Sequence, residues 1–200
     1  YVSSFALLGI DKEGLLSTDE KLEVLIARNA WQKELIWNRF SMDQLGMSIS
    51  QPDKVRRSSQ TISVGNTGNW STKNYLPMGC LKNKETDSIL FWQIEQNGSW
   101  YWEISDQDGH MYLQLSGPTE HQSHWWKNLK PGDTFASVPV SVGSACGDVE
   151  EAAGELTKYR RAIRRKNEDN EKLPVIFNDY MNCLWGDPTT EKELPLIDKA

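Results

Sequence analysis

Residues 88–104 read SILFWQIEQNGSWYWEI, and this stretch contains two runs in which apolar and polar residues alternate. The first run spans 88–94 and the second spans 99–104. Alternation with a period of two is typical of β-strands that bury one face. Between the runs, the step Asn97-Gly98 supplies the positive φ angles that a tight turn needs. The stretch therefore predicts a hairpin of two antiparallel strands.

The same pattern continues on both sides of this stretch. Further alternating runs occur at residues 22–26, 111–115 and 134–142. Asp106-Gln107-Asp108-Gly109 is a second turn signal, and Pro139 would remove a ladder donor from the last run, which favours an edge strand or a bulge there. We therefore predict that residues 1–146 form a mainly β domain, an antiparallel meander that buries one face as a β-sandwich.

The composition changes after Gly147. Apolar residues then recur on one helical stripe, formed by Val149, Ala152, Ala153, Leu156, Tyr159 and Ile163. Acidic residues precede basic ones along this run, which complements the helix dipole. We predict a helix over 149–166 inside a linker of residues 147–172. The basic cluster at 160–166 is interpreted as a solvated face and not as a nucleic-acid patch.

A second change follows the linker. Residues 173–181 form a short apolar run without a polar face, which is typical of a strand buried on both sides in a parallel sheet. Thr190 and Glu193 are spaced as a capping box and predict a helix over 191–200. Residues 173–200 therefore predict one βα unit.

Polar and aromatic residues follow the predicted buried strand. They are Asn178, Asp179, Tyr180 and Asn182, with Trp185 in the next loop. In α/β folds, ligands bind beyond the carboxyl ends of the strands, so this position favours a binding site. The alternative is that Asn178 and Asp179 only end the strand and hydrogen-bond the following loop.

Composition restricts the function classes. The 200 residues include 22 basic and 28 acidic side chains, a net charge of −6, which disfavours nucleic acid or an anionic membrane as the main partner. The sequence has neither a long apolar run nor a signal peptide, and its first residue is not Met, so we expect a soluble piece of a longer protein. Cys80, Cys146 and Cys183 lie far apart, which argues against a disulfide framework and a zinc knuckle and fits a reducing, cytoplasmic compartment. We expect no metal and no cofactor.

Several motifs resemble one enzyme family. Residues 174–182 (PVIFNDYMN), followed by 186–189 (GDPT) and 194–200 (LPLIDKA), resemble the opening of the catalytic barrel in α-galactosidases of glycoside hydrolase family 36. Upstream motifs are similar to the N-terminal domain of that family: 3–5 (SSF), 9–11 (GID), 31–35 (WQKEL), 56–59 (RRSS), 130–135 (KPGDTF) and 159–161 (YRR). In this order the motifs cover nearly the whole chain.

The resemblance implies an antiparallel β-supersandwich, a linker helix and the first βα unit, residues 173–200, of a truncated (β/α)₈ barrel. It implies a retaining hydrolase of terminal α-galactosides, which uses two carboxyl groups about 5 Å apart. The family's catalytic carboxylates lie on later barrel strands, so we expect no catalytic residue in this chain and no activity from it alone. Asp179, Tyr180 and Asn178 are expected to bind substrate. Many family members have Trp-Glu where this chain has Tyr180 and Met181, which leaves the accepted glycoside open.

The resemblance also implies partners. In this family, loops of the N-terminal domain reach over the barrel mouth, sometimes from a neighbouring subunit. Trp70, in a Gly- and Asn-rich loop, is therefore a candidate cap on a sugar pocket, unless it packs on the sandwich surface. Trp185 is a further candidate for substrate binding. The expected partners are melibiose- or raffinose-type oligosaccharides and further copies of the chain. The alternative is a stand-alone carbohydrate-binding β-sandwich in which Trp100 and Trp102 stack on sugars and do not form the core.

Overall fold

The structure is a computed structural model that describes residues 5–8, 21–47, 60–107 and 110–199. The chain divides into two compact units, which are described separately below. We call Tyr1–Tyr159 the sandwich unit and Arg160–Ala200 the C-terminal unit. The sandwich unit is mainly β, and the C-terminal unit contains helices and extended chain.

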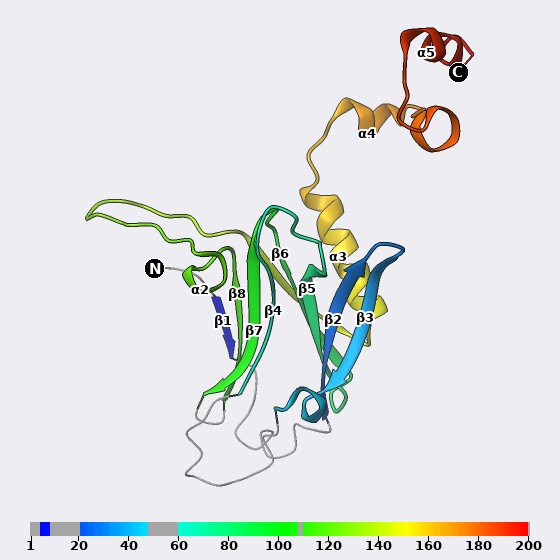
Figure 1. The fold of residues 1–200 in the computed structure, drawn as a ribbon. Coiled ribbons are helices and arrows are strands. Elements are labelled where there is room, and N and C mark those ends of the chain that lie inside the picture. Colours follow the sequence, from blue (N-terminus) through cyan, green and yellow to red (C-terminus); the bar gives the residue numbers. More distant parts are fainter. Residues whose placement is uncertain (1–4, 9–20, 48–59, 108–109, 200) are drawn as a thin grey trace. The chain divides into compact units, whose positions relative to one another are not determined.

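Two antiparallel sheets face each other in the sandwich unit (Figure 1). The four-stranded sheet has the order β1 (Phe5–Leu8), β8 (His110–Ser116), β7 (Trp100–Gln107) and β4 (Thr61–Asn66). The five-stranded sheet has the order β3 (Lys33–Ser41), β2 (Leu22–Ala30), β5 (Tyr75–Asn83), β6 (Ser88–Ile94) and β9 (Val140–Cys146). Short helical turns lie between strands, namely η2 (Asp43–Leu45) and α2 (Glu120–Ser123). The predicted mainly β, antiparallel sandwich is confirmed.

Tryptophan side chains fill the space between the sheets. Trp92 on β6 meets Trp102 on β7 edge-to-face, with ring centroids 5.2 Å apart and planes at 75°. Trp100 is also buried, and its indole N–H donates to the carbonyl of Ser71 at 2.7 Å. A Cβ at Gly79 would lie 2.5 Å from the Trp92 ring, so only glycine lets this ring lie against β5. The alternative in which Trp100 and Trp102 form a sugar-stacking surface is therefore wrong.

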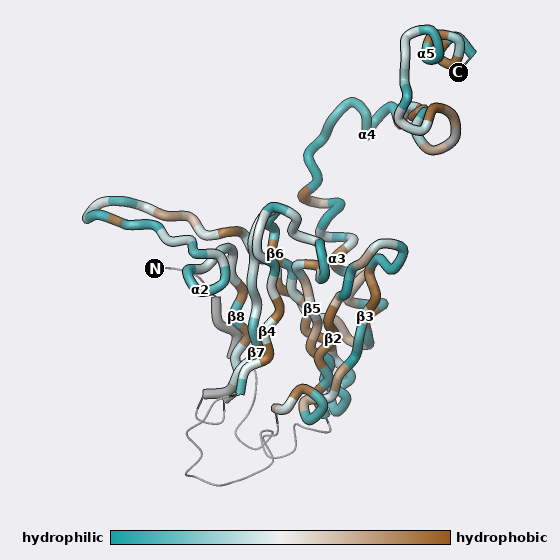
Figure 2. Tube along the Cα trace, in the orientation of Figure 1, coloured by the Kyte–Doolittle hydropathy of each residue, from teal (hydrophilic) through white to brown (hydrophobic). Residues whose placement is uncertain are grey.

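A helix covers the other face of the five-stranded sheet. Helix α3 (Val149–Ile163) places Ala152 and Leu156 against a second apolar cluster that contains Cys80 and Phe91. Hydrophobic residues accordingly dominate β2 and β5, whereas the short helix α4 (Glu168–Lys172) is hydrophilic (Figure 2). The helix predicted after Gly147 is confirmed, and it ends three residues before the predicted position.

The start of α3 is attached to the sheet through charged groups. Asp148 accepts a hydrogen bond from the Val149 N–H at 2.7 Å, and its own N–H donates to Glu151 at 2.8 Å. Arg39 on β3 contacts both carboxylate oxygens of Asp148 at 2.7 Å and Glu23 at 2.8 Å. Burial opposes the charge of Asp148, but the hydrogen bonds from Arg39 and Val149 outweigh it, so the pKa of Asp148 is lowered.

Two predictions about the strands are wrong. The run at 88–104 is not a hairpin, because β6 and β7 belong to different sheets. β6 pairs with β5 and β9 and is covered on both faces, and the link after Ile94 crosses to the other sheet. The last predicted strand begins only at Val140, directly after Pro139, and it is an edge strand as Pro139 suggested. The hairpin of β7 and β8 is confirmed.

The C-terminal unit contains no strand among its described residues. Its elements are α4 (Glu168–Lys172), the π-helical turn η3 (Tyr180–Leu184) and α5 (Thr190–Ile197). The strand predicted at 173–181 is wrong: Val175 is 99% exposed, and no described segment supplies the ladder partner that a strand needs. The barrel start that the resemblance implies is therefore not seen. A helix does follow, with Thr189 and not Thr190 as its N-cap, and no side-chain cap bond is formed there.

Candidate functional site

Residues 178–186 of the C-terminal unit form a local turn. The side-chain oxygen of Asn178 accepts the Tyr180 N–H at 3.0 Å, which starts the helical turn η3. The turn ends at Trp185, which has a φ of 49°, and Gly186 follows with a φ of 84°. These left-handed residues redirect the chain toward α5. Asn178 therefore hydrogen-bonds the turn that follows it, as the structural alternative predicted, although it does not end a strand.

This turn brings two aromatic rings together. The ring centroids of Tyr180 and Trp185 are 6.5 Å apart, with planes at 55°. Tyr180 is 53% exposed and Trp185 is 68% exposed, so a face of each side chain remains open to solvent. A Cβ at Gly186 would lie 3.2 Å from the Tyr180 ring, so glycine gives this ring its space. We call Tyr180 and Trp185 the aromatic corner.

Two carboxyl groups meet in the same unit. The side chain of Glu193 on α5 shares a hydrogen bond with Asp179, and this bond, followed by desolvation and the charge of Asp179, raises the pKa of Glu193. Two neighbouring carboxyl groups offer several oxygen acceptors to the hydroxyl groups of a ligand. The predicted capping box of Thr190 and Glu193 is wrong. Its contact with Asp179 depends on the turn between residues 185 and 189 and has no sequence signature.

The fifth predicted site residue lies in the other unit. Trp70 belongs to the link between β4 and β5 of the sandwich unit, where its carbonyl accepts the Lys73 N–H at 3.3 Å. Its side chain is 63% exposed, which disagrees with close packing on the sandwich surface. Asn178, Asp179, Tyr180 and Trp185 thus come together within one unit, while Trp70 is a separate exposed aromatic.

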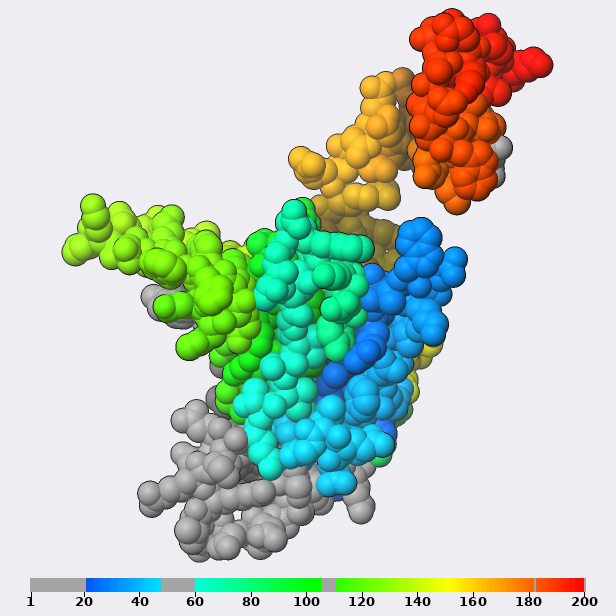
Figure 3. All heavy atoms as spheres, viewed as in Figure 1, coloured from blue at the N-terminus to red at the C-terminus, as the bar shows by residue number. Residues whose placement is uncertain are grey.

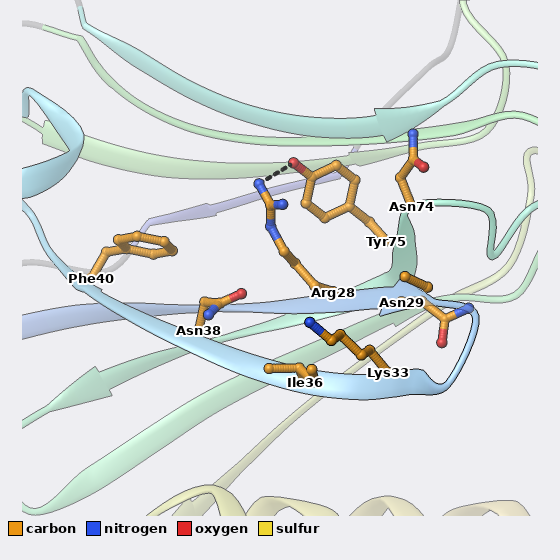
Figure 4. A pocket seen from close by; sticks show the side chains of 9 residues that line it. Arg28, Asn29, Lys33, Ile36, Asn38, Phe40, Asn74 and Tyr75 are labelled. Atoms are coloured by element: carbon orange, nitrogen blue, oxygen red, sulfur yellow. Dashed lines mark hydrogen bonds between the residues drawn. The ribbon is translucent and has the colours of Figure 1, made fainter.

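The sandwich unit contains a cleft that was not predicted from the sequence. It has a volume of about 550 Å³ and lies at the end of the five-stranded sheet where β2 turns into β3 (Figure 4). Arg28 and Lys33 line it, together with asparagine and aromatic side chains. The available signal was Arg28 itself, which follows Val24 and Ile26 at the period-two positions of a buried face.

No protein-family model matches the chain, and no curated protein matches it. Within the described ranges, no three His, Cys, Asp or Glu side chains are grouped to hold a metal ion. None of the described helices is long and apolar enough to cross a bilayer.

Proposed function

We propose that this chain is the N-terminal part of a retaining α-galactosidase, in which the C-terminal unit supplies part of the sugar-binding rim. The aromatic corner beside the Asp179–Glu193 pair carries the proposal. The less polar face of galactose stacks on aromatic rings, and paired carboxyl groups bind its hydroxyl groups. The resemblance of residues 174–200 to family 36 α-galactosidases supports the same substrate class, oligosaccharides of the melibiose and raffinose type.

Asp179 has a binding role in this proposal and not a catalytic one. Retaining glycosidases keep their nucleophile and their acid/base about 5 Å apart, on opposite sides of the scissile bond. The side chains of Asp179 and Glu193 instead interact directly with each other, whereas a catalytic pair faces the sugar from two sides. The catalytic pair therefore belongs to the longer protein that the resemblance implies. The three cysteines, which are free thiols, are compatible with the cytoplasmic location we propose.

Replacing Tyr180 with alanine is expected to lower kcat/KM of the longer protein for melibiose about tenfold, mainly through KM. The exposed ring offers stacking that is worth on the order of 1 kcal/mol. Tyr180→Phe retains the ring and should stay within about twofold of the parent. Steady-state kinetics on melibiose and a chromogenic α-galactoside provide the measurement.

Three further results decide this test. Trp31→Ala removes an exposed tryptophan of the sandwich unit and should leave the kinetics unchanged. Absence of α-galactosidase activity from the longer protein would contradict the proposal as a whole. Turnover by the 200-residue chain alone, lost in Asp179→Asn, would show instead that this chain holds a catalytic carboxylate.

We also propose that the protein is a homo-oligomer that associates through the sandwich unit. Residues 124–139, which we call the arm, project from the sheets (Figure 3). The rings of Trp125 and Phe135 pack at 5.8 Å across the arm, while Trp126 and Leu129 are exposed. Exposed apolar side chains gathered on one segment favour a protein contact, and in this proposal a second copy of the chain supplies that contact.

Replacing Trp126 with serine is therefore expected to shift the assembly toward monomer. Loss of a large aromatic from an interface typically weakens association by 2 kcal/mol or more, about 30-fold in Kd. Size-exclusion chromatography with light scattering, over a range of protein concentrations, measures the shift. Trp70→Ser is the matched control, since it removes an equally exposed tryptophan outside the arm. An unchanged mass distribution for Trp126→Ser would exclude the arm as the interface.

A further inference from the structure

The cleft lies at the β2–β3 end of the sandwich unit, where the inner face of the five-stranded sheet changes from apolar to polar residues. Along β2, Val24 and Ile26 point toward the other sheet and belong to the core between the sheets. The next residue on this face is Arg28, and Asn38 on β3 lies directly opposite Ile26. The inner face of the sheet therefore changes from apolar to polar within one strand pair, at the end of the sheet where Arg28 is exposed and Asn38 is half-buried.

The cleft is strongly asymmetric in charge. The residues that line it are Arg28, Asn29, Ala30, Lys33, Ile36, Asn38, Phe40, Asn74 and Tyr75, so it holds two cations and no acid. Neither cation makes an ion pair with a carboxylate of the described part of the chain. Two uncompensated positive charges on a concave surface attract an anion.

Arg28 is held in position by an aromatic residue. Its Nη2 donates to the Tyr75 hydroxyl at 3.1 Å, and the guanidinium lies 5.1 Å from the centre of the Tyr75 ring. This cation–π contact fixes the guanidinium and leaves its other N–H groups for a ligand. Figure 4 shows Lys33 on the neighbouring strand, with its amino end directed toward Asn38. The cations thus approach one cavity from two strands.

Asparagine side chains in the cleft can recognise the hydroxyl groups of a ligand. The side-chain oxygen of Asn38 is buried and has no hydrogen-bond partner among the described residues. A buried acceptor without a partner costs free energy, which a donating ligand would recover. Asn29 has a different role: its Nδ2 donates to the Thr72 carbonyl at 2.6 Å and its oxygen accepts the Leu35 N–H at 3.3 Å. These bonds fix the end of the hairpin, so the cleft is formed before a ligand enters.

We propose that this cleft binds a polyhydroxylated anion, a sugar that carries a carboxylate or a phosphate group. Arg28 and Lys33 bind the anionic group, Asn38 and Asn74 bind hydroxyl groups, and Phe40 contacts the C–H face of the ring. The cleft lies in the sandwich unit, and the inference does not depend on the proposed α-galactosidase function.

The test is calorimetric titration of the 200-residue chain at low salt. The probes are galacturonate, galactose 6-phosphate, neutral galactose, acetate and inorganic phosphate. We expect one or both of the acidic sugars to bind at least tenfold more tightly than galactose, acetate or phosphate, and the stronger of the two identifies the anionic group. Equal binding of galactose and the acidic sugars would overturn the role of the cations. Equal binding of acetate or phosphate would overturn the recognition of hydroxyl groups.

Two variants assign the binding to this cleft. Asn38→Asp is nearly isosteric and adds one negative charge beside the cations, so we expect it to weaken the acidic sugar at least tenfold. The carboxylate meets cations there, so the variant should remain folded, which circular dichroism checks. Arg28→Gln with Lys33→Gln should have the same effect. The controls are Asn97→Asp in an exposed turn and Lys130→Gln at the tip of the arm, and both should bind as the parent does. If Asn38→Asp also binds as the parent does, the cleft is not the site.

Discussion

Trp102→Ala is expected to lower the free energy of unfolding of the sandwich unit by about 3–5 kcal/mol. Trp102 is 0% exposed, lies opposite Val64 and Leu115 in the sheet and packs edge-to-face on Trp92. Alanine would leave a cavity between two sheets that cannot approach each other, because several other large side chains hold them apart. Urea unfolding followed by circular dichroism measures the change.

Two variants accompany this measurement. Trp102→Phe keeps much of the ring and removes an indole N–H that has no partner among the described residues, so it should cost less than Trp102→Ala. Trp31→Ala, at an exposed turn, should change stability by no more than about 0.5 kcal/mol. If Trp102→Ala kept the parent's stability but lost sugar binding, the tryptophan would be a binding residue and the core described above would be wrong.

The strands that could be predicted are those with an alternating pattern. Ser88–Ile94 was predicted with the bounds that the structure shows, because Ile89, Phe91, Trp92 and Ile94 fill two different cores. Its partners could not be predicted in the same way. Alternation records which face of a strand is buried, and it carries no information on which sheet the strand joins. The Asn97-Gly98 step fits a hairpin and a crossing between sheets equally well.

Strand β5 shows a different limit. It contains Pro77 and Gly79, both of which are depleted in strands, and it was not predicted from the sequence. Gly79 is required only because Trp92 lies against it from the neighbouring strand. Such a requirement comes from a long-range contact and is invisible in local propensity.

The apolar run after Leu173 shows the opposite error. Its composition favours a strand, but the described residues provide no neighbour to pair with it, and a strand is stable only within a ladder.

The candidate sites could be predicted only where their residues are neighbours in the sequence. The aromatic corner could be predicted, because Tyr180 and Trp185 are close in sequence. The pairing of Asp179 with Glu193 could not, since it depends on the path of the chain between them.

Cys80 is expected to be almost inert to thiol reagents in the folded protein. It is buried on β5 under helix α3, and burial, with a smaller contribution from the charge of Asp148, raises its pKa from 9.0 to about 12. At about pH 8 the reactive thiolate is therefore roughly a thousandfold scarcer than for an ordinary thiol. Cys146 and Cys183 are exposed. A chromogenic disulfide reagent should thus react rapidly with two thiols, and with the third only after urea is added.

The raised pKa also has a consequence for stability. The folded state keeps the Cys80 thiol protonated, whereas the unfolded chain releases the proton near its ordinary pKa. The contribution of this group to stability is therefore complete below pH 9 and is lost progressively as the pH rises from 9 to about 12. Cys80→Ala removes this dependence, and it should show two reactive thiols both with and without urea.

Cys80 can become reactive when α3 opens by itself or when the whole sandwich unit unfolds, and its reaction rate distinguishes the two. Leu156 packs in the same cluster as Cys80, so Leu156→Ala should loosen α3 and speed the reaction of Cys80. If α3 opens by itself, this rate should rise further than the change in global unfolding free energy accounts for. If the two changes agree, the thiol is exposed only when the whole sandwich unit unfolds. Three thiols that react at one rate in the native protein would contradict the placement of α3 over this sheet.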